Sequence, residues 1–333
     1  IFKFRKNTFT KQECDAAYAG LREAATESQN RGMAAGPRGN QLGQEGRGNR
    51  DWVTAEHLEI LSFLARPLNT IDDGTTIESI KQSHKLFSKE ETRGQVWLRS
   101  AVTKKYPEYH GWFDKWLAGT HNLSREEQIK EAQYVIDNYI SDTNYAQSVM
   151  SGIAGFFDRY PRIPHGRACS YNEKQPDKFA LSFPYLQKLN DQFKELIPGR
   201  WAAQNEQASL LDPRFRIANT VFTTLTVNHN WRTACHRDAG DFEEGFGNLV
   251  ILEDPSKERM KWNGGYLGFP QYGVAVNVRN GDYLAMDVHQ WHANTEIIPI
   301  KSTKQSSTLM NELEHARLSI VSYLRKNMIR CEK

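Results

Sequence analysis

The stretch TACHRDAGDFEEGFGN, residues 233–248, combines a histidine, several charged residues and three glycines directly after a run rich in β-branched residues. On a β-strand, residues two apart point to the same side. His236 and Asp238 would therefore present an imidazole and a carboxylate to one point. Together they are two of the three ligands in the facial set that holds Fe(II) with open coordination positions. An H-x-D triplet also occurs by chance, so a polar loop that happens to contain a histidine is the alternative.

A third ligand must come from a later strand, and the segment MDVHQWHANTEI offers His289 and His292. These histidines are three residues apart, so on a regular strand they face opposite sides and only one of them can join the site. His292 is the better candidate because it opens the next apolar run and is followed by the small residue Ala293.

The last predicted strand has one polar and one apolar face. Leu318, Ile320 and Leu324 share the apolar face, whereas the other face carries Arg317, Ser319, Val321, Tyr323 and Arg325. A face with two arginines and a tyrosine cannot be buried without polar or anionic partners. If it lines a barrel, Arg317 can bind a carboxylate through two parallel hydrogen bonds, as the cosubstrate of a 2-oxoglutarate dioxygenase requires. The alternative is a ladder of arginines on a solvent-exposed edge strand.

The first half of the chain reads mainly as helical. A capping box at Thr10 opens a helix, a second one at Ser124 opens a helical run to about Phe157, and residues 178–198 form an amphipathic helix. The Gly/Arg-rich segment 31–52 has too few apolar residues to form a core and is predicted to be a loop. Its arginines suit contact with phosphate groups, and a solvated linker is the alternative.

The second half changes to a period of two, which is typical of strands. The first strand is expected within 217–227, and further strands at 248–253, 265–269, 273–279, 282–288, 291–297 and 316–325. Closely spaced strands with glycine-rich turns indicate a sandwich, jelly roll or barrel. We therefore expect an α+β fold with an α-rich N-terminal part, residues 1–175, packed on a β-core, residues 176–333, as one compact unit.

Composition narrows the class of protein. The 333 residues are 39% hydrophobic and 25% charged, which suits a globular core, and no apolar run approaches the length that spans a bilayer. The net charge of +3 argues neither for nor against nucleic acid. The first residues show no signal peptide, and the four scattered cysteines favour a reduced, intracellular protein.

Three blocks of this sequence resemble the TET/JBP family of DNA-modifying 2-oxoglutarate dioxygenases, in its short versions. The blocks are TVFTTLTVNHNWRTACHRDAGDFEEGFGNLVIL, GGYLGFPQYGVAVNVRNGDYLAMDVHQWHANTEI and RLSIVSYLR. The resemblance implies a double-stranded β-helix (a cupin-like jelly roll) and Fe(II)- and 2-oxoglutarate-dependent oxidation of the C5-methyl group of a pyrimidine in DNA. It assigns His236, Asp238 and His292 as iron ligands and Arg317 as the partner of 2-oxoglutarate.

The same resemblance assigns the target-base pocket. Asp241 matches a position that holds the base, Tyr323 matches an aromatic residue that stacks on it, and Arg325 stands where relatives often have histidine. Arg167 is matched to the other end of 2-oxoglutarate, with Arg162 as the less favoured alternative. The expected substrate is 5-methylcytosine in a flipped or single-stranded nucleotide. Thymine in DNA and a non-DNA substrate are the alternatives. We expect a monomer that acts on DNA inside the cell: in the nucleus of a eukaryote, or in the cytoplasm of a bacterium or phage-infected cell.

Overall fold

The structure, a computed structural model, describes residues 1–28, 34, 69–71, 149–159, 163–231, 233, 236–255, 262–269, 272, 274–294, 297–299 and 317–331. The predicted loop 31–52 lies outside these residues apart from Ala34, as does the predicted helix from Ser124 up to residue 148. No helix in the described ranges is long and apolar enough to cross a membrane.

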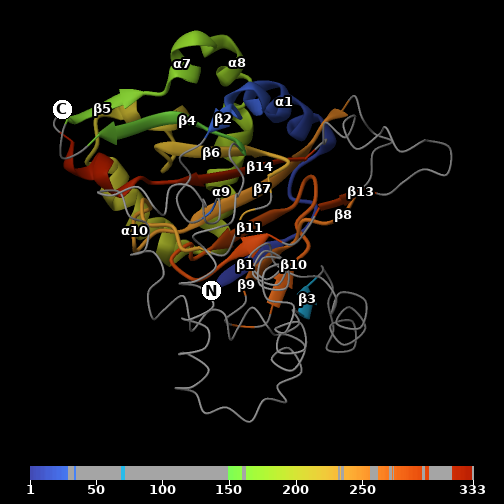
Figure 1. Cartoon of the computed structure of the whole chain (residues 1–333). Coiled ribbons are helices and arrows are strands. Elements are labelled where there is room, and N and C mark those ends of the chain that lie inside the picture. The colour runs from blue at the N-terminus through green and yellow to red at the C-terminus, as the bar shows by residue number, and fades with distance from the viewer. Residues whose placement is uncertain are drawn as a thin grey trace, which may run out of the picture.

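A large antiparallel sheet forms the centre of the described part of the chain (Figure 1). Its strands run in the order β1-β11-β7-β14-β6-β4-β2, and β5 pairs beside β4. Their bounds are β1 (Phe2–Arg5), β2 (Glu27–Ser28), β4 (Val149–Arg159), β5 (Ile163–Ala168), β6 (Thr224–His229), β7 (Gly247–Glu253), β11 (Tyr283–Met286) and β14 (Arg317–Tyr323). Strands from the beginning, middle and end of the chain are thus neighbours in one sheet.

A smaller sheet covers one face of the large sheet. It has the order β12-β9-β10-β3, and β8 pairs with β13 nearby. The bounds are β3 (Asn69–Ile71), β8 (Trp262–Gly264), β9 (Leu267–Phe269), β10 (Val274–Val276), β12 (Ala293–Asn294) and β13 (Ile297–Pro299). A buried apolar cluster joins the two sheets, with Leu249, Ile251 and Leu284 from the large sheet and Leu267 and Phe269 from the small one.

Helices cover the opposite face of the large sheet. They are α1 (Lys11–Leu21), α7 (Ser170–Lys174), α8 (Pro176–Ala180), α9 (Phe183–Leu196) and α10 (Pro198–Ser209), with short 3-10 helices η1 (Arg22–Ala24), η7 (Pro213–Phe215), η8 (Ile217–Asn219) and η12 (Lys326–Arg330). The capping box predicted at Thr10 is present, because Thr10 and Glu13 each accept the other's backbone N–H. The helix predicted over 178–198 is confirmed as α8 and α9, which are separated at Leu181 and Ser182.

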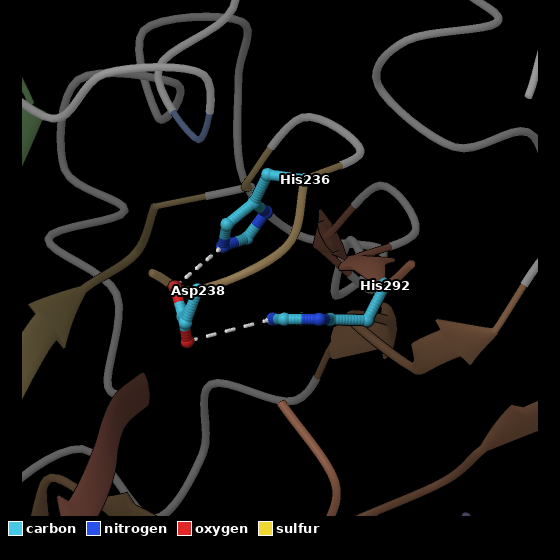
Figure 2. Close-up of side chains that lie close together, drawn as sticks. All are labelled: His236, Asp238 and His292. Carbon is cyan, nitrogen blue, oxygen red and sulfur yellow. Dashed lines mark ion pairs between the residues drawn. The ribbon is translucent and has the colours of Figure 1, made fainter. Parts of the chain in front are cut away.

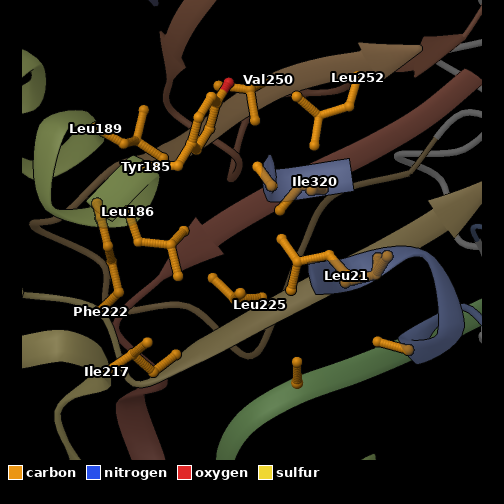
Figure 3. Close-up of a cluster of buried hydrophobic side chains, with 14 of the residues drawn as sticks. Leu21, Tyr185, Leu186, Leu189, Ile217, Phe222, Leu225, Val250, Leu252 and Ile320 are labelled. Atoms are coloured by element: carbon orange, nitrogen blue, oxygen red, sulfur yellow. The ribbon is translucent and has the colours of Figure 1, made fainter. Parts of the chain in front are cut away.

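The core between helices and sheet follows strand alternation (Figure 3). Val250 and Leu252 of β7 point into the helix-side core, which also holds Leu186 and Leu189 of α9 and Leu21 of α1, whereas the intervening Ile251 faces the small sheet. The same alternation on β14 puts Leu318 and Ile320 in the helix-side core. The other residues of β14 therefore face the space between the two sheets.

Two sequence predictions are wrong. The helical run predicted to end near Phe157 is contradicted at its described end, because Val149–Arg159 is strand β4, paired with β6. Short apolar runs do not distinguish a buried strand from a helix, and here long-range pairing decided the outcome. The strand predicted over 217–227 begins only at Thr224. Ala218 and Asn219, which precede it, have positive φ angles of 48° and 60° that break an extended chain.

The predicted division at residue 175 stays a prediction, but the two parts share a sheet. β1 pairs with β11, and β4 pairs with β6, so strands from before residue 176 are hydrogen-bonded to strands from after it. The later strand predictions around β7, β11 and β14 agree with the structure to within a few residues.

Leu189 provides a test of the helix-to-sheet core, because its side chain has 0% exposure between α9 and the sheet. Leu189→Ala should lower the free energy of unfolding by about 2–5 kcal/mol, since it removes buried methyl groups and leaves a cavity. Urea unfolding followed by circular dichroism measures the change. Leu210, which is 63% exposed, is the control: Leu210→Ala should change stability by no more than about 0.5 kcal/mol. Equal effects of both changes would contradict this packing.

Candidate active site

Residues 236–242 form a strap between the two sheets rather than the regular strand that the sequence suggested. At one end, His236 and His292 form an antiparallel bridge in which each backbone N–H donates to the other's carbonyl at 3.0 Å. At the other end, Asp241 forms an antiparallel bridge with Arg325, just beyond β14. The strap is thus tied to the small sheet before β12 and to the large sheet after β14. The path of the strap is therefore determined by these two backbone bridges, and not by an alternating pattern of residues along the strap.

The strap brings His236, Asp238 and His292 together (Figure 2). The Nε2 atom of His236 lies 3.4 Å from Oδ1 of Asp238, and Nε2 of His292 lies 3.9 Å from Oδ2 of the same carboxylate. One ligand atom from each residue lies within 4.8 Å of the others, so a single metal ion can contact all three. His289, the other candidate, turns instead to Asp287, with its Nδ1 atom 3.3 Å from Oδ1. Two imidazoles and one carboxylate are the ligand types that suit Fe(II) with open positions.

Hydrogen bonding and burial prepare these groups to bind a cation. Nδ1 of His292 lies 2.9 Å from the carbonyl oxygen of Gln290, so it must be the protonated nitrogen and Nε2 is left with its lone pair. Burial, together with the neighbouring charge of His236, lowers the pKa of His292 to about 4. Burial raises the pKa of Asp238, but the hydrogen bond and charge of His236 and the charges of His292 and His289 lower it more. At neutral pH the site therefore offers a carboxylate and a neutral His292 imidazole.

Arg317 is a buried cation with free donors. Its side chain is 2% exposed, and its Nη2 donates to the carbonyl of Gly265 at 3.1 Å. Its Nε and Nη1 atoms find no hydrogen-bond partner within the described residues. Burial and the charge of Arg279 lower its pKa to about 10, so it is still charged at neutral pH. A buried guanidinium with two unused donors fits a bound carboxylate, because burying such donors without a partner is costly.

A cavity of about 280 Å³ opens beside the metal ligands. The residues around it include three from the predicted base pocket and three from the polar face of the adjoining strands: Asp241, Tyr323, Arg325, Asn228, Ser319 and Val321. Ser319, Val321, Tyr323 and Arg325 of the polar face predicted for 317–325 therefore border the cavity, whereas Arg317 is not among the residues that line it. The exposed-ladder alternative fails because β14 is paired with a strand on each side. Oδ1 of Asp241 is buried with no hydrogen-bond partner in the described structure. Burial and the charge of Asp238 raise the pKa of Asp241 well above its usual value, against the charges of Arg325 and Lys326.

Arg167 does not border this cavity. It lies on β5, opposite Phe157 in the register, with its guanidinium 4.5 Å from the centre of the Phe157 ring. Its Nε and Nη2 atoms have no hydrogen-bond partner in the described part of the chain. The assignment of Arg167 to 2-oxoglutarate stays a prediction, with free donors in its favour and its place outside the cavity lining against it.

The sequence analysis missed three polar residues close to the site. Asp158 is 4% exposed and forms an ion pair with Nε of Arg325. Asn228 borders the cavity and accepts a hydrogen bond from Ser151, and Asn294 accepts one from Thr233 at 2.8 Å. Each interrupts an apolar or β-branched run, as in GFFDR, TLTVNH and HANTEI. A polar residue within a buried strand is the signal that could have identified them.

Comparison with known proteins identifies the class. Residues 153–326, just over half of the chain, match the Tet_JBP family, described as the oxygenase domain of the 2OGFeDO superfamily. The chain is 35% identical over 178 residues to the thymine dioxygenase JBP1 of Trypanosoma brucei brucei, which is 53% of this chain and 19% of that protein. It is 34% identical over 154 residues to the JBP1 of Crithidia fasciculata, covering 45% and 18%. The matches thus span less than a fifth of these relatives.

A more distant likeness is to a solved structure described as NgTET1 in complex with 5mC DNA. It covers 54% of this chain and 61% of that one, with a TM-score of 0.37 and 16% sequence identity. A likeness this low supports no structural detail.

The chain belongs to the Tet_JBP family, an oxygenase family of the superfamily that depends on 2-oxoglutarate and Fe(II). The resemblance seen in the sequence is confirmed. The cofactors are accordingly Fe(II) and 2-oxoglutarate, and the superfamily implies a jelly-roll core, in keeping with the mixture of helices and antiparallel sheets. The His-Asp-His group and the free donors of Arg317 suit these two cofactors.

Removal of a metal ligand tests the centre. His236→Ala and Asp238→Ala should each weaken Mn(II) binding, measured by calorimetry as a stand-in for Fe(II), by more than about 100-fold. Loss of an outer-shell partner alone costs roughly 10–100-fold. His165→Ala is the control, because His165 is exposed on β5. Circular dichroism checks that the fold persists. Unchanged binding in either ligand variant would refute the assignment.

Arg317→Met tests the cosubstrate site. Replacing the guanidinium should weaken 2-oxoglutarate binding by at least about 30-fold, since losing one partner of a buried charge pair costs roughly 2–5 kcal/mol. Without 2-oxoglutarate the variant should be about as stable as the parent, because removal of a buried charge with two unpartnered donors offsets the loss of the hydrogen bond from Nη2 to Gly265. Arg214→Met is the control, because the Arg214 side chain is 78% exposed. Affinity for 2-oxoglutarate at the parent level would exclude Arg317 from this role.

Proposed function

We propose that this protein hydroxylates the C5-methyl group of a pyrimidine base in DNA, with 5-methylcytosine as the first candidate base. The observation that carries the proposal is Asp241: a buried carboxyl with a free Oδ1 atom that borders the same cavity as the metal ligands. A ligand with hydrogen-bonding groups on its edge would satisfy it, and a pyrimidine has such an edge.

The chain's own residues supply the binding and the orientation. His236, Asp238 and His292 would hold Fe(II), and Arg317 would bind the distal carboxylate of 2-oxoglutarate. When both cofactors are bound, they supply the oxidising power that puts an oxygen atom from O₂ into a C–H bond. The task of the protein is to place one methyl group close to the metal and to keep water out of the site.

Base binding falls to Asp241, Tyr323 and Arg325. In DNA the C5-methyl group lies in the major groove, so the base must be flipped out or single-stranded to reach a buried metal, at a cost of a few kcal/mol. Stacking on Tyr323, which borders the cavity, would return about 1–3 kcal/mol. Arg325 can only donate hydrogen bonds, whereas Asp241, with its raised pKa, can accept them and can also hold a proton.

Two bases fit this pair. In 5-methylcytosine the amino group can donate to Asp241 while N3 and O2 accept from Arg325. Most of the hydrogen-bonding groups on the edge of this base would then have a partner. In thymine N3–H can donate to Asp241 while O4 or O2 accepts from Arg325. Support for thymine comes from the relatives named thymine dioxygenase, although they are matched over less than a fifth of their length. Thymine is therefore the second candidate.

The proposal extends to the fold of the core, the oligomeric state and the location of the protein. The two facing sheets suit a double-stranded β-helix whose open end holds the cavity, with residues 1–175 and 176–333 packed as one unit. The protein would act as a monomer on DNA inside the cell. A 2-oxoglutarate oxygenase of another substrate is the remaining alternative.

Mass spectrometry of nucleosides tests the function. The protein is incubated with Fe(II), 2-oxoglutarate and DNA that contains both 5-methylcytosine and thymine. Formation of 5-hydroxymethylcytosine supports the first candidate, and 5-hydroxymethyluracil supports the second. Consumption of 2-oxoglutarate with neither product would point to a substrate other than a methylated pyrimidine in DNA.

Asp241→Ala tests the base pocket. Product formation should fall by at least tenfold, while 2-oxoglutarate consumption should fall much less, because Asp241 holds the base and not the cosubstrate. The ratio of hydroxymethyl product to succinate measures this difference. Asp212, a half-buried residue that pairs with the exposed Arg214 and does not line the cavity, gives the control Asp212→Ala, which should keep the parent ratio. Equal loss of product and of 2-oxoglutarate consumption in Asp241→Ala would remove its base-binding role.

A further inference from the structure

Asp158 is a buried carboxylate that the proposed reaction does not yet use. It lies on β4 at the point where the pairing with β5 shifts register between Phe157 and Arg159. Its side chain is only 2% exposed, and its Oδ1 atom forms an ion pair with Nε of Arg325. A buried carboxylate needs such a partner, because removing its charge from water is costly.

The other end of the same guanidinium reaches the cavity. Arg325 borders the cavity together with Gly240 and Asp241. A Cβ atom built on Gly240 would lie 3.5 Å from Nη1 of Arg325, which locates that nitrogen against the strap. The backbone of Arg325 is also held, because its N–H donates to Oγ1 of Thr223 at 3.0 Å and it is bridged to Asp241. Arg325 is therefore fixed by its backbone and by Nε, and Nη1 is the end that lies at the cavity.

We propose that Asp158 is a positioning residue for base recognition: its ion pair holds the guanidinium of Arg325 beside Asp241, so that the target base meets a fixed donor next to a fixed carboxyl. The inference rests on the proposed function and adds to it the residue that positions Arg325. Asp158 acts through Arg325 and has no role in metal or 2-oxoglutarate binding.

The length and flexibility of an arginine side chain explain why Arg325 needs a partner that holds its guanidinium in place. A free guanidinium samples many rotamers, and fixing it in one position costs side-chain entropy. The ion pair with Asp158 orders the guanidinium of Arg325 before the base binds, so base binding does not have to bear this entropy cost. A base held by a mobile donor would leave its methyl group misplaced, and a misplacement of about 1 Å can cost roughly 100-fold in rate. Cosubstrate turnover would continue without transfer of oxygen to the base.

The test compares Asp158→Asn, Arg325→Gln and the double variant with the parent, each as the full chain. Asparagine and glutamine keep the approximate shapes but remove the charges. The readouts are the hydroxymethyl product formed per succinate, KM for methylated DNA and the thermal midpoint. Asp212→Asn is the matched control, because it alters an Asp–Arg pair on the surface, where Arg214 is 78% exposed.

In Asp158→Asn, the product per succinate should fall about tenfold and KM for DNA should rise several-fold. The double variant should be no worse than Arg325→Gln alone, because both changes break one contact, and Asp212→Asn should match the parent. The double variant lacks both charges and therefore leaves no buried charge unpaired. It can be assayed even if Asp158→Asn folds poorly.

Two results would overturn the inference. One is a product-per-succinate ratio in Asp158→Asn equal to that of the parent, which includes an equal loss of product and succinate; the other is additive losses in the double variant. A parent protein that forms no hydroxymethyl base would overturn the proposed function together with this inference, whereas an active parent with either result overturns the inference alone.

Discussion

The backbone bridge between His236 and His292 is the interaction on which the site depends. The two histidines are far apart in the sequence, and their paired N–H and C=O groups set the two imidazoles side by side, with ring centres 4.3 Å apart. Asp238 follows two residues later on the same strap, and Asp241 ties the strap to the end of β14. One short segment thus carries two of the residues that can hold a metal ion and the buried carboxyl that we propose binds the base, and its two ends are held by different sheets.

Two residues proposed to bind ligands carry buried polar atoms without a partner in the described part of the chain. Arg317 has two such donors, and Asp241 has one such oxygen. Each such group destabilises the protein unless a ligand or a water molecule forms the missing hydrogen bonds. The apolar core between the helices and the large sheet and the apolar cluster between the two sheets must offset that cost.

Alternation along β14 connects these two layers. Ile320 packs among the helix-side residues, whereas Ser319 and Val321 border the cavity. Arg317 and Tyr323 share the cavity face by the same parity. A slip of one residue in the pairing of β14 with β6 and β7 would bury leucines in the active site and place arginine in the apolar core, so the apolar cluster fixes the register that the chemistry needs.

By itself the sequence determined the features that depend on neighbouring residues. These are the capping box at Thr10, the helix after residue 178, the two faces of the last strand and the small set of residues able to bind a metal. Only the tertiary structure decided what depends on long-range pairing: that 149–159 is a strand, that His236 and His292 bridge through their backbones, and that Asp158 meets Arg325. The physical reason is that side-chain period is a local property, whereas strand partners, and the charges that burial forces to pair, are chosen across the whole chain.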